Sequence, residues 1–419
     1  MSGEALPALP RPLPPGERDP WPRFAAAMFR IGVNSFGGPV AQIGFMHREA
    51  VERHRWLDDA QFLHLVSFAN VLPGPEALEV AIHLGFLRRG RMGGIVAGLL
   101  FLWPGFVALT ALAWIYVTFG RVAGVEGFLD GIRPVAAALL AFAAIRLSSR
   151  ALQCAPAVVL MAAAFGASHF LRVPFLLLLF SSGLLGLLLP RLPGAEPGAR
   201  SPRAAPLLVI AALALGFFLP PRSGDLPPQS VAEREGARPA PPAGPERLAA
   251  IAWINTRAAL VTFGGAYTVL PYLREQMAVR ERWVTDREMV DALALGETTP
   301  GPLISIGVFL SYLAGGFPGA LVGGLCLFAP SFVLVLGLAR YLDRVTRSRQ
   351  AQRFLWGVSA GTLGLILSLA ARLLPPSVPD LFAAAIASAA LLALWRLRAN
   401  ALLTVLAGGL AGLARHLLS

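Results

Sequence analysis

Two Pro-Gly-Pro triplets lie in the interior of apolar segments, at Pro73-Gly74-Pro75 and at Pro300-Gly301-Pro302. Proline removes a backbone donor and clashes with the preceding helical turn, so each triplet interrupts a helix. A new helix can begin at Glu76 and at Leu303, because proline is favoured in a first turn. The free amides and positive dipole end of such a helix attract anions. The triplets therefore predict an anion site. The alternative is a pair of kinks that touch no ligand.

Paired glycines and two arginines are further candidates for substrate binding. Gly37-Gly38 and Gly264-Gly265 would let a backbone approach a ligand closely, or would let two helices pack tightly. Arg30 and Arg257 precede these glycines inside apolar surroundings. A guanidinium fits a tetrahedral oxyanion through two parallel hydrogen bonds. The alternative for both arginines is an extended side chain that reaches the membrane interface.

Carboxylates and hydroxyls flank the two breaks. Glu76, Glu79 and Glu297 are intramembrane carboxylates, which are functional candidates by default. A charged carboxylate would repel an anion, so protonation of one of them could couple proton movement to anion movement. The alternative is a carboxylate that only caps a helix start. Thr298 and Thr299 could line the same cavity.

The remaining reactive residue types do not form a catalytic pattern. The two cysteines, Cys154 and Cys326, lie in separate apolar segments, and the six histidines show no ligand spacing. The sequence also lacks the glycine-rich loop that holds the phosphates of ATP. We therefore expect no catalytic residue, no metal site and no cofactor, and a protein that is not an enzyme.

The composition predicts the elements that position these residues. The chain of 419 residues is 56% hydrophobic and only 14% charged, whereas soluble domains carry about 25% charged residues. Apolar stretches near the length of a membrane span recur along it. The sequence contains no lysine, and its arginines gather between apolar runs, which favours a lipid bilayer over nucleic acid as the partner. The fold class that we predict is an all-α polytopic membrane protein.

The two halves of the chain repeat each other. The string at 35–43, SFGGPVAQI, matches TFGGAYTVL at 262–270, and both Pro-Gly-Pro triplets share the same offset of 227 residues. Basic loops in one half match neutral loops in the other, so the positive-inside rule predicts inverted repeats of about six hydrophobic segments each. The N-terminus is expected in the cytosol and the C-terminus outside. The loops expected in the cytosol are 88–91, 191–203, 273–288, 340–353 and 397–399.

These patterns divide the chain into four parts. Residues 1–23 form a disordered N-terminal tail, residues 24–190 the first membrane repeat, and residues 247–419 the second. A linker at 191–246 is rich in proline and glycine and contains one more hydrophobic segment at 204–220, expected as an extra linking helix. This odd crossing would allow the second half to be inverted.

The strings FGGP, PGPEA and ETTPGPLI, in this combination, resemble the two halves of the long-chain chromate ion transporters. The resemblance covers nearly the whole chain from Phe24 onward and is weakest in 191–246. It implies secondary active efflux of chromate across the bacterial inner membrane, shared with sulfate. Glu79 and Val308 depart from the glutamines expected there, which affects selectivity if these residues touch the substrate.

The sequence as a whole predicts alternating access around one tetrahedral oxyanion, with chromate efflux as the preferred function. Uptake or exchange of sulfate or a related anion is an alternative, because the two dianions are alike. A membrane-embedded enzyme acting on a lipid phosphate is a second alternative, and it would need a base, a nucleophile or a metal cluster. The sequence leaves a homodimer open.

Overall fold

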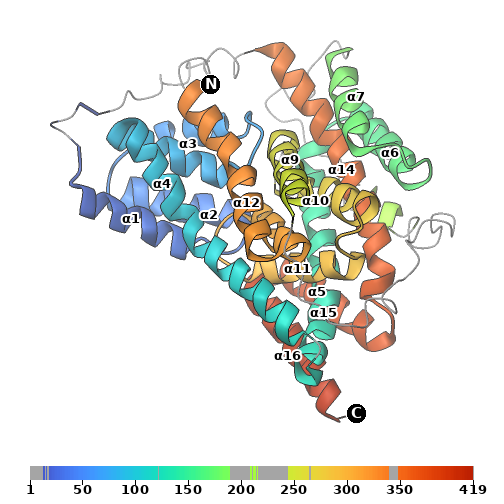
Figure 1. Ribbon diagram of the computed structural model, residues 1–419. Helices are drawn as coiled ribbons and strands as arrows, with labels where there is room; N and C mark the ends of the chain where they lie inside the picture. Colours follow the sequence, from blue (N-terminus) through green and yellow to red (C-terminus); the bar gives the residue numbers. More distant parts are fainter. Residues whose placement is uncertain are drawn as a thin grey trace.

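A computed structural model describes residues 18–120, 122–188, 244–263, 266–338 and 348–418, with isolated positions in 13–16 and 208–215. Every regular element within these residues is helical (Figure 1). The all-α fold class is therefore confirmed. Most of the expected N-terminal tail, linker and linking helix at 204–220 lies outside the described residues.

Within the described residues, five helices are long and apolar enough to cross a membrane, and they include 76–119, 123–149 and 349–377. Large apolar side chains are exposed along them at intervals of four residues, as at Leu99 and Trp103. An exposed apolar stripe on a long helix is the surface that faces lipid. We therefore treat the chain as spanning the bilayer several times.

The first repeat starts with two short helical hairpins and ends with longer helices. Its elements are α1 (Trp21–Val33), α2 (Gly38–His47), the π-helix η2 (Arg48–Arg53), α3 (Asp59–Ala69), α4 (Glu76–Phe119), α5 (Ala123–Ala151), α6 (Ala155–His169) and α7 (Phe175–Leu188). The chain leaves helical geometry after Val33 and again between Ala69 and Glu76, at the glycine pair and the Pro-Gly-Pro triplet. These breaks fall where proline and glycine predict them.

The second repeat follows the same order. Its elements are α9 (Pro245–Val261), η3 (Ala266–Thr268), α10 (Val269–Leu273), the π-helix η4 (Arg274–Arg280), α11 (Asp286–Glu297), η5 (Leu303–Ser305), α12 (Ile306–Leu338), α14 (Arg349–Ser377), α15 (Leu381–Arg396) and α16 (Ala401–Leu418). Both α3 and α11 begin with a capping box, at Asp58 and Thr285, in which the side chain at the helix start bonds a backbone amide three residues later.

Unusual backbone conformations recur at equivalent positions, which shows that the repeat is structural. Arg55 and Arg282 both have positive φ values, 49° and 53°, and Arg172 and Arg398 have 56° and 52°. Non-glycine residues adopt this region rarely, so two matched pairs do not arise from composition. Helix α4 bends sharply at Arg89 and Gly90, and α12 bends with nearly the same angles at Gly315 and Gly316.

At its bend, helix α4 folds back on itself. A side chain on Gly85 would overlap Gly93, so the arm before the bend packs directly against the arm after it. We call the arms α4a (76–88) and α4b (91–119), and the equivalent arms of α12 are α12a (306–314) and α12b (317–338). Of these four arms, α4b and α12b are long enough to cross a bilayer.

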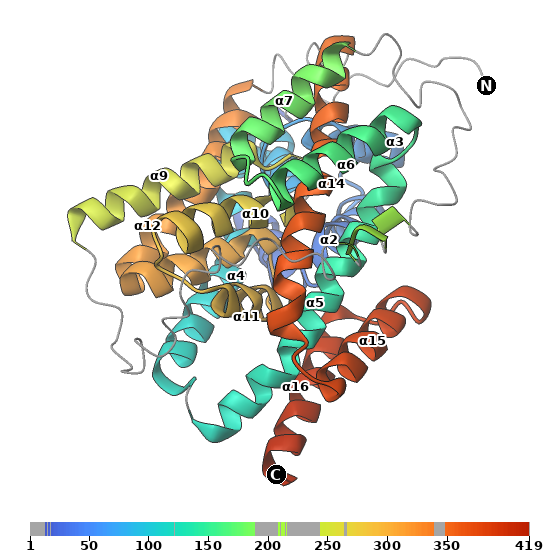
Figure 2. The same ribbon diagram turned by 90° about the vertical axis from the view of Figure 1, so that its right-hand side faces the viewer.

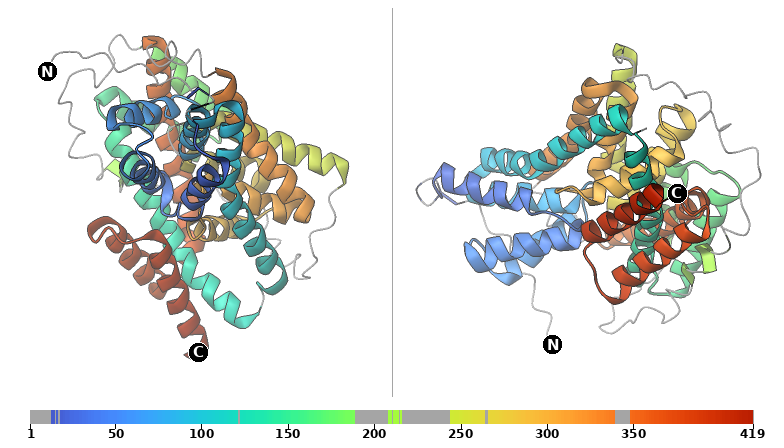
Figure 3. Two further views of the ribbon diagram at one scale, coloured as in Figure 1. Left: turned by 90° about the vertical axis from the view of Figure 1, so that its left-hand side faces the viewer. Right: turned by 90° about the horizontal axis from the view of Figure 1, so that it is seen from below.

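The hairpins of the first repeat return to the face from which they enter. Trp56, which follows η2, packs on Phe24 in α1, and the guanidinium of Arg88 lies over the Trp56 ring. Arg88 also pairs with Asp19 at 2.7 Å, just before α1. The start of α1, the end of η2 and the end of α4a therefore share one face, which we call the first face. Figure 3 shows these blue elements gathered at one side of the molecule.

The loop before α11 lies at the opposite end of α4b, on what we call the second face. Tyr116, near the end of α4b, donates a hydrogen bond to Asp291 at 2.8 Å, and Arg287 pairs with Asp130 at 2.8 Å. The expectation that 273–288 shares a side with 88–91 was therefore wrong. The cause is that the hairpins turn back at their breaks, whereas the sequence analysis read them as crossings.

Helices α4b and α12b run antiparallel at the centre of the molecule. The position of Gly94 is beside Leu336, that of Gly98 is beside Phe332, and that of Gly324 is beside Phe106. Two equivalent crossing helices with opposite directions place the repeats in opposite orientations, which is the arrangement that we predicted.

The repeats exchange their last helices. Helix α5 packs against α15 and α16 of the second repeat, and α14 packs against α6 and α7 of the first (Figures 1 and 2). Close glycine contacts hold both bundles, Gly131 against Gly408 and Gly412, and Gly357 against Gly186. Small residues allow helices in lipid to approach closely. The two repeats therefore form one intertwined unit.

Candidate functional site

The four interrupted segments meet, and two equivalent hydrogen bonds join them crosswise. The amide of Gly74 donates to the carbonyl of Thr262 at 2.9 Å, and the amide of Gly301 donates to the carbonyl of Ser35 at 2.8 Å. Each Pro-Gly-Pro triplet is thus joined to the break after the first helix of the other repeat. We call this junction the central site.

The central site lies halfway along the crossing helices. A side chain on Gly105 in α4b would overlap the carbonyl of Pro300, so the second triplet touches α4b there. Residue 105 is the midpoint of α4b, which spans 91–119. A side chain on Gly74 would lie 2.6 Å from the hydroxyl of Ser331 in α12b, the position equivalent to Gly105. Interrupted backbone at membrane depth is tolerated where protein surrounds it.

The glycines at the central site adopt conformations that other residues rarely adopt. Gly37 and Gly38 have φ values of 85° and 79°, and Gly74 and Gly301 have 138° and 96°. The Gln42 side chain donates to the carbonyl of Gly301 at 2.5 Å and to that of Ser35 at 3.3 Å. Gly264 and Gly265 lie outside the described residues.

Glu79 is the carboxylate most completely enclosed by protein at this site. Its side chain is 0% exposed, and neither of its carboxylate oxygens has a hydrogen-bond partner within the described residues. A side chain on Gly74 would lie 2.6 Å from one of these oxygens, so the carboxylate faces the triplet. Burying an unpaired charge costs several kcal/mol, so this group needs a proton or a bound partner.

Glu297 and two threonines contribute further oxygens from the second repeat. Glu297, the last residue of α11, is buried and accepts a hydrogen bond from the hydroxyl of Tyr267. Thr298 donates to the carbonyl of Leu295 at 2.7 Å, and Thr299 donates to that of Gly296 at 2.9 Å. Each threonine hydroxyl keeps acceptor capacity, but its proton is used within the chain.

Glu76 opens α4a and is only partly buried. The amides of Leu78 and Glu79 both donate to the carbonyl of Pro75, at 2.9 and 3.1 Å. The first turn of α4a is thus closed by its own backbone at these two residues. In the second repeat the corresponding turn is the 3₁₀ segment η5, which starts after Pro302.

Arg30 lies in the first hairpin, where it has a partner. Its guanidinium pairs with Glu49 at 2.8 Å and lies 3.4 Å from the Nε2 atom of His54. Burial lowers the pKa of His54, although the carboxylate of Glu49 opposes that shift. The structure therefore brings Arg30 to Glu49 and not to the triplets.

Arg257, the equivalent of Arg30, lies over the ring of Trp253 with 4.3 Å between guanidinium and ring centre. Trp253 is 58% exposed on the outer side of α9. A cation over an exposed aromatic ring is typical of a side chain at the rim of the bilayer.

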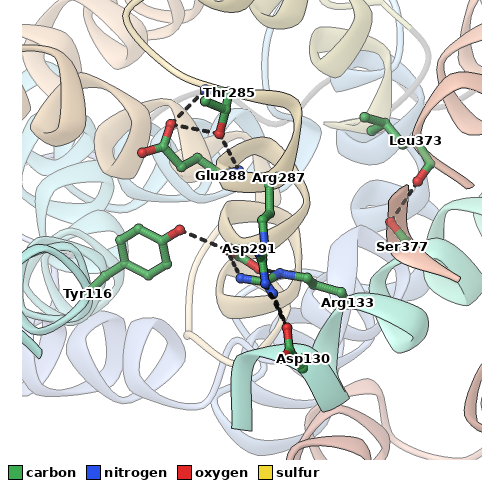
Figure 4. A network of polar contacts seen from close by, with 9 residues as sticks. All are labelled: Tyr116, Asp130, Arg133, Thr285, Arg287, Glu288, Asp291, Leu373 and Ser377. Atoms are coloured by element: carbon green, nitrogen blue, oxygen red, sulfur yellow. Dashed lines mark hydrogen bonds and ion pairs between the residues drawn. The ribbon is translucent and has the colours of Figure 1, made fainter. Parts of the chain in front are cut away.

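A buried ionic network, which was not predicted from the sequence, joins the repeats (Figure 4). Asp291 in α11 is 0% exposed and accepts from Arg133 in α5, at 2.7 and 2.9 Å, and from Tyr116 in α4b. Asp130 joins the network by accepting hydrogen bonds from Arg133 and Arg287. An aspartate inside an apolar segment was the signal that could have identified it.

Comparison with known proteins places the chain among transporters. The sequence profile described as "Chromate transporter" matches residues 23–187 and again residues 249–413. The chain is 35% identical to a chromate transport protein of Pseudomonas aeruginosa, over 94% of this chain and 92% of that protein. It is 26% identical to a probable chromate transport protein of Synechococcus elongatus, over 88% of each chain.

A shorter relative matches only part of the chain. An uncharacterized transporter of Bacillus subtilis, YwrB, is 35% identical over 134 residues, which is 32% of this chain and 68% of that protein. No solved structure matches the chain. The two successive matches to the chromate transporter profile, at 23–187 and 249–413, agree with the two structural repeats.

Proposed function

This chain belongs to the chromate transporter family, and from that premise we propose that it exports chromate by alternating access around the central site. The relatives are named as transporters, and the chain shares their apolar helices. Chromate is a tetrahedral dianion, and a secondary transporter moves such an ion by exposing one site to each face in turn.

The crosswise junction of the four breaks is the observation that carries this proposal. Gly74 bonds Thr262 and Gly301 bonds Ser35, halfway along α4b and α12b, so movement of one repeat against the other changes the site directly. Hairpins that enter from opposite faces give each face its own route to the same residues.

The anion is held chiefly by backbone dipoles at the junction. The starts of α4a and η5 carry the positive ends of their helices, and Thr298 and Thr299 lie beside the second triplet. Gly37, Gly38, Gly264 and Gly265, with the proline and glycine residues of both triplets, allow the backbone to approach the ligand. Arg30 and Arg257 contribute long-range positive charge from the hairpins.

A carboxylate at the junction supplies the coupling to protons. Glu79 has the strongest claim among Glu76, Glu79 and Glu297, because both of its oxygens lack a described partner while Glu297 is bonded to Tyr267. Glu79 gains and loses its proton in step with anion binding and release, which couples proton movement to anion movement.

The arginine distribution supports a cytosolic first face. Arg88, Arg89 and Arg91 cluster in the bend of α4, on the first face. The N-terminus is then cytosolic and the C-terminus outside. The membrane potential, negative inside, favours export of a dianion by about 2.3 kcal/mol per charge per 100 mV.

Transport into inside-out vesicles tests the proposal. Purified protein is reconstituted, and uptake of radiolabelled chromate is measured with and without an imposed proton gradient and membrane potential. We expect uptake that the gradient accelerates and that protein-free vesicles lack. Unlabelled sulfate is the competitor that tests for a shared or preferred sulfate substrate. Vesicles that accumulate no chromate under any gradient would refute the proposal.

A further inference from the structure

A polar cavity near the central site has a lining that is rich in arginine. It has a volume of about 270 Å³ and is bounded by the turn between α6 and α7, by α10 and η4, and by α14. The charged residues in its lining are Arg172, Arg274, Arg280, Arg372 and Glu275. We call this cavity the arginine pocket.

The pocket is assembled from both repeats and is held by specific contacts. Arg372 in α14 donates to the carbonyls of Ser168 and His169, at 3.0 and 2.8 Å, at the end of α6. The amide of Phe175, the first residue of α7, donates to Glu275 in η4 at 2.6 Å. The α6–α7 turn of the first repeat is thereby fixed against the second repeat.

The lining of the pocket holds more guanidinium groups than carboxylates. Arg274 makes two bonds of 2.7 Å to Asp286, and Arg280 pairs with Glu275 at 3.0 Å. The lining itself holds four guanidinium groups and one carboxylate, Glu275, so its formal charge is positive. Planar guanidinium donors at several angles suit a tetrahedral oxyanion group that carries two negative charges.

The pocket lies on the second face and adjoins the central site. Asp286 begins α11, next to Arg287, whose partner Asp130 marks that face. Tyr267, which bonds Glu297 at the central site, is followed directly by α10, whose Pro271 lines the pocket. The two sites are thus separated by about one helical turn along the chain.

From this geometry we infer that the arginine pocket is a second binding site, which takes a tetrahedral oxyanion group with two negative charges. As a free dianion, the ligand is the transported ion at the mouth of the central site; as part of a lipid, it is a phosphate headgroup. The first reading rests on the proposed oxyanion transport, whereas the charge and shape of the pocket do not.

Residue-resolved protection from an arginine reagent tests the site directly. The full chain in detergent is treated with phenylglyoxal, and modification of each arginine is followed by mass spectrometry. Selenate, a tetrahedral dianion, is added in one arm and phosphatidic acid in another. We expect protection at Arg172 and Arg280. Arg415 is the matched control, because it is 52% exposed and ion-paired, as Arg280 is at 55%.

The arms separate the two sources of the ligand. Protection by selenate supports a site for the free ion, and protection by phosphatidic acid alone supports a headgroup site. No protection in either arm, or equal protection at Arg415, would overturn the inference. In the double variant Arg172→Gln/Arg280→Gln, we follow the ligand concentration that gives half-maximal protection of Arg372. We expect this concentration to rise by about tenfold for each guanidinium lost. In Arg415→Gln the same concentration should be unchanged.

A transport measurement keeps this inference separate from the proposed function. If the free ion uses the pocket, the double variant raises the apparent KM for chromate and leaves the maximal rate unchanged. Protection without any chromate transport would remove the proposed function and keep the pocket. Transport of chromate without protection in either arm would remove the inferred binding site at the pocket and keep the proposed function.

Discussion

Glu79 and Glu297 bring one buried carboxylate from each repeat to the interrupted segments, but they are not equivalent residues. The position equivalent to Glu79 is Ile306, and the position equivalent to Glu297 is Asn70. The backbone of the central site is therefore symmetric, whereas its ionisable side chains are not. A symmetric backbone can serve both faces equally, and in the proposed mechanism Glu79 is the group that carries the coupled proton.

Replacement of Glu79 by glutamine tests this role. The amide has nearly the same shape but cannot carry an exchangeable charge, so chromate uptake in Glu79→Gln should lose its dependence on the proton gradient. We expect the gradient-driven rate to fall by about tenfold, as for a coupling free energy of about 1.4 kcal/mol. The melting temperature should not fall, because the buried carboxylate has no described partner to lose.

The control for that experiment is Glu246→Gln, in the exposed first turn of α9. It should transport like the unaltered protein. If chromate uptake by Glu79→Gln still depends fully on the proton gradient, another group carries the coupled proton. Glu297 and Glu76 are then the remaining candidates.

Arg133 and Asp291 form a buried ion pair that no sequence motif identified. Removal of one partner leaves a buried charge uncompensated, so Arg133→Met should lower the free energy of unfolding by about 3–5 kcal/mol. The double variant Arg133→Met/Asp291→Leu should recover most of that loss, because no charge is left alone. Thermal unfolding in detergent, compared across the wild type, both single variants and the double variant, measures the coupling. Additive losses would show that the pair has no coupling.

At the scale of the elements, the sequence predicts where helices stop but not where the chain goes next. The glycine and proline pairs identify the breaks after α1, α3, α9 and α11. A break of this kind permits either a straight continuation through the bilayer or a return to the same face. The contacts of Trp56 with Phe24 and Arg88 show that the hairpin returns to the first face. These contacts join residues that are far apart in the chain, so the sequence pattern does not reveal them. The Arg133–Asp291 pair spans 158 positions and was hidden for the same reason.

The two triplets should respond differently to the same substitution. Gly74→Ala and Gly301→Ala both place a methyl group on a backbone with positive φ, at 138° and 96°, which costs about 1–3 kcal/mol. At Gly74 the new atom would also lie 2.6 Å from Glu79 and Ser331, whereas at Gly301 the nearest atom is 3.7 Å away. We expect Gly74→Ala to lose more thermal stability and more transport.

Gly337→Ala is the control for this comparison, because nothing lies within 4 Å of the added atom and the residue has no positive φ. It should behave like the unaltered protein in both assays. Equal losses in Gly74→Ala and Gly301→Ala would show that backbone strain alone, and not contact with Glu79, sets the effect.

At the scale of the whole molecule, inversion follows from the antiparallel pairing of α4b and α12b, and exchange of the last helices locks the repeats together. The sequence predicts the inversion from its arginine pattern, because the positive-inside rule acts on each loop separately. It does not predict the exchange, since α5 with α16 and α14 with α7 are joined by small residues that carry no charge signal. A molecule joined in this way can rock about its centre but cannot separate into halves.

Labelling of single cysteines tests the inversion and the returning hairpins together. Cys154 and Cys326 are first replaced by alanine. Single cysteines are then introduced at Glu52 and at its repeat equivalent Val279, whose side chains are 61% and 43% exposed. A third single cysteine, at Arg91, marks the first face. A membrane-impermeant maleimide is applied to intact and to opened cells. Because η2 returns to the first face, positions 52 and 91 should label from the same side. Because the repeats are inverted, position 279 should label from the other side. If positions 52 and 91 label from opposite sides, the first hairpin crosses the bilayer. If positions 52 and 279 label from the same side, the repeats are parallel. In that case, hairpins from opposite faces could not meet at a shared central site.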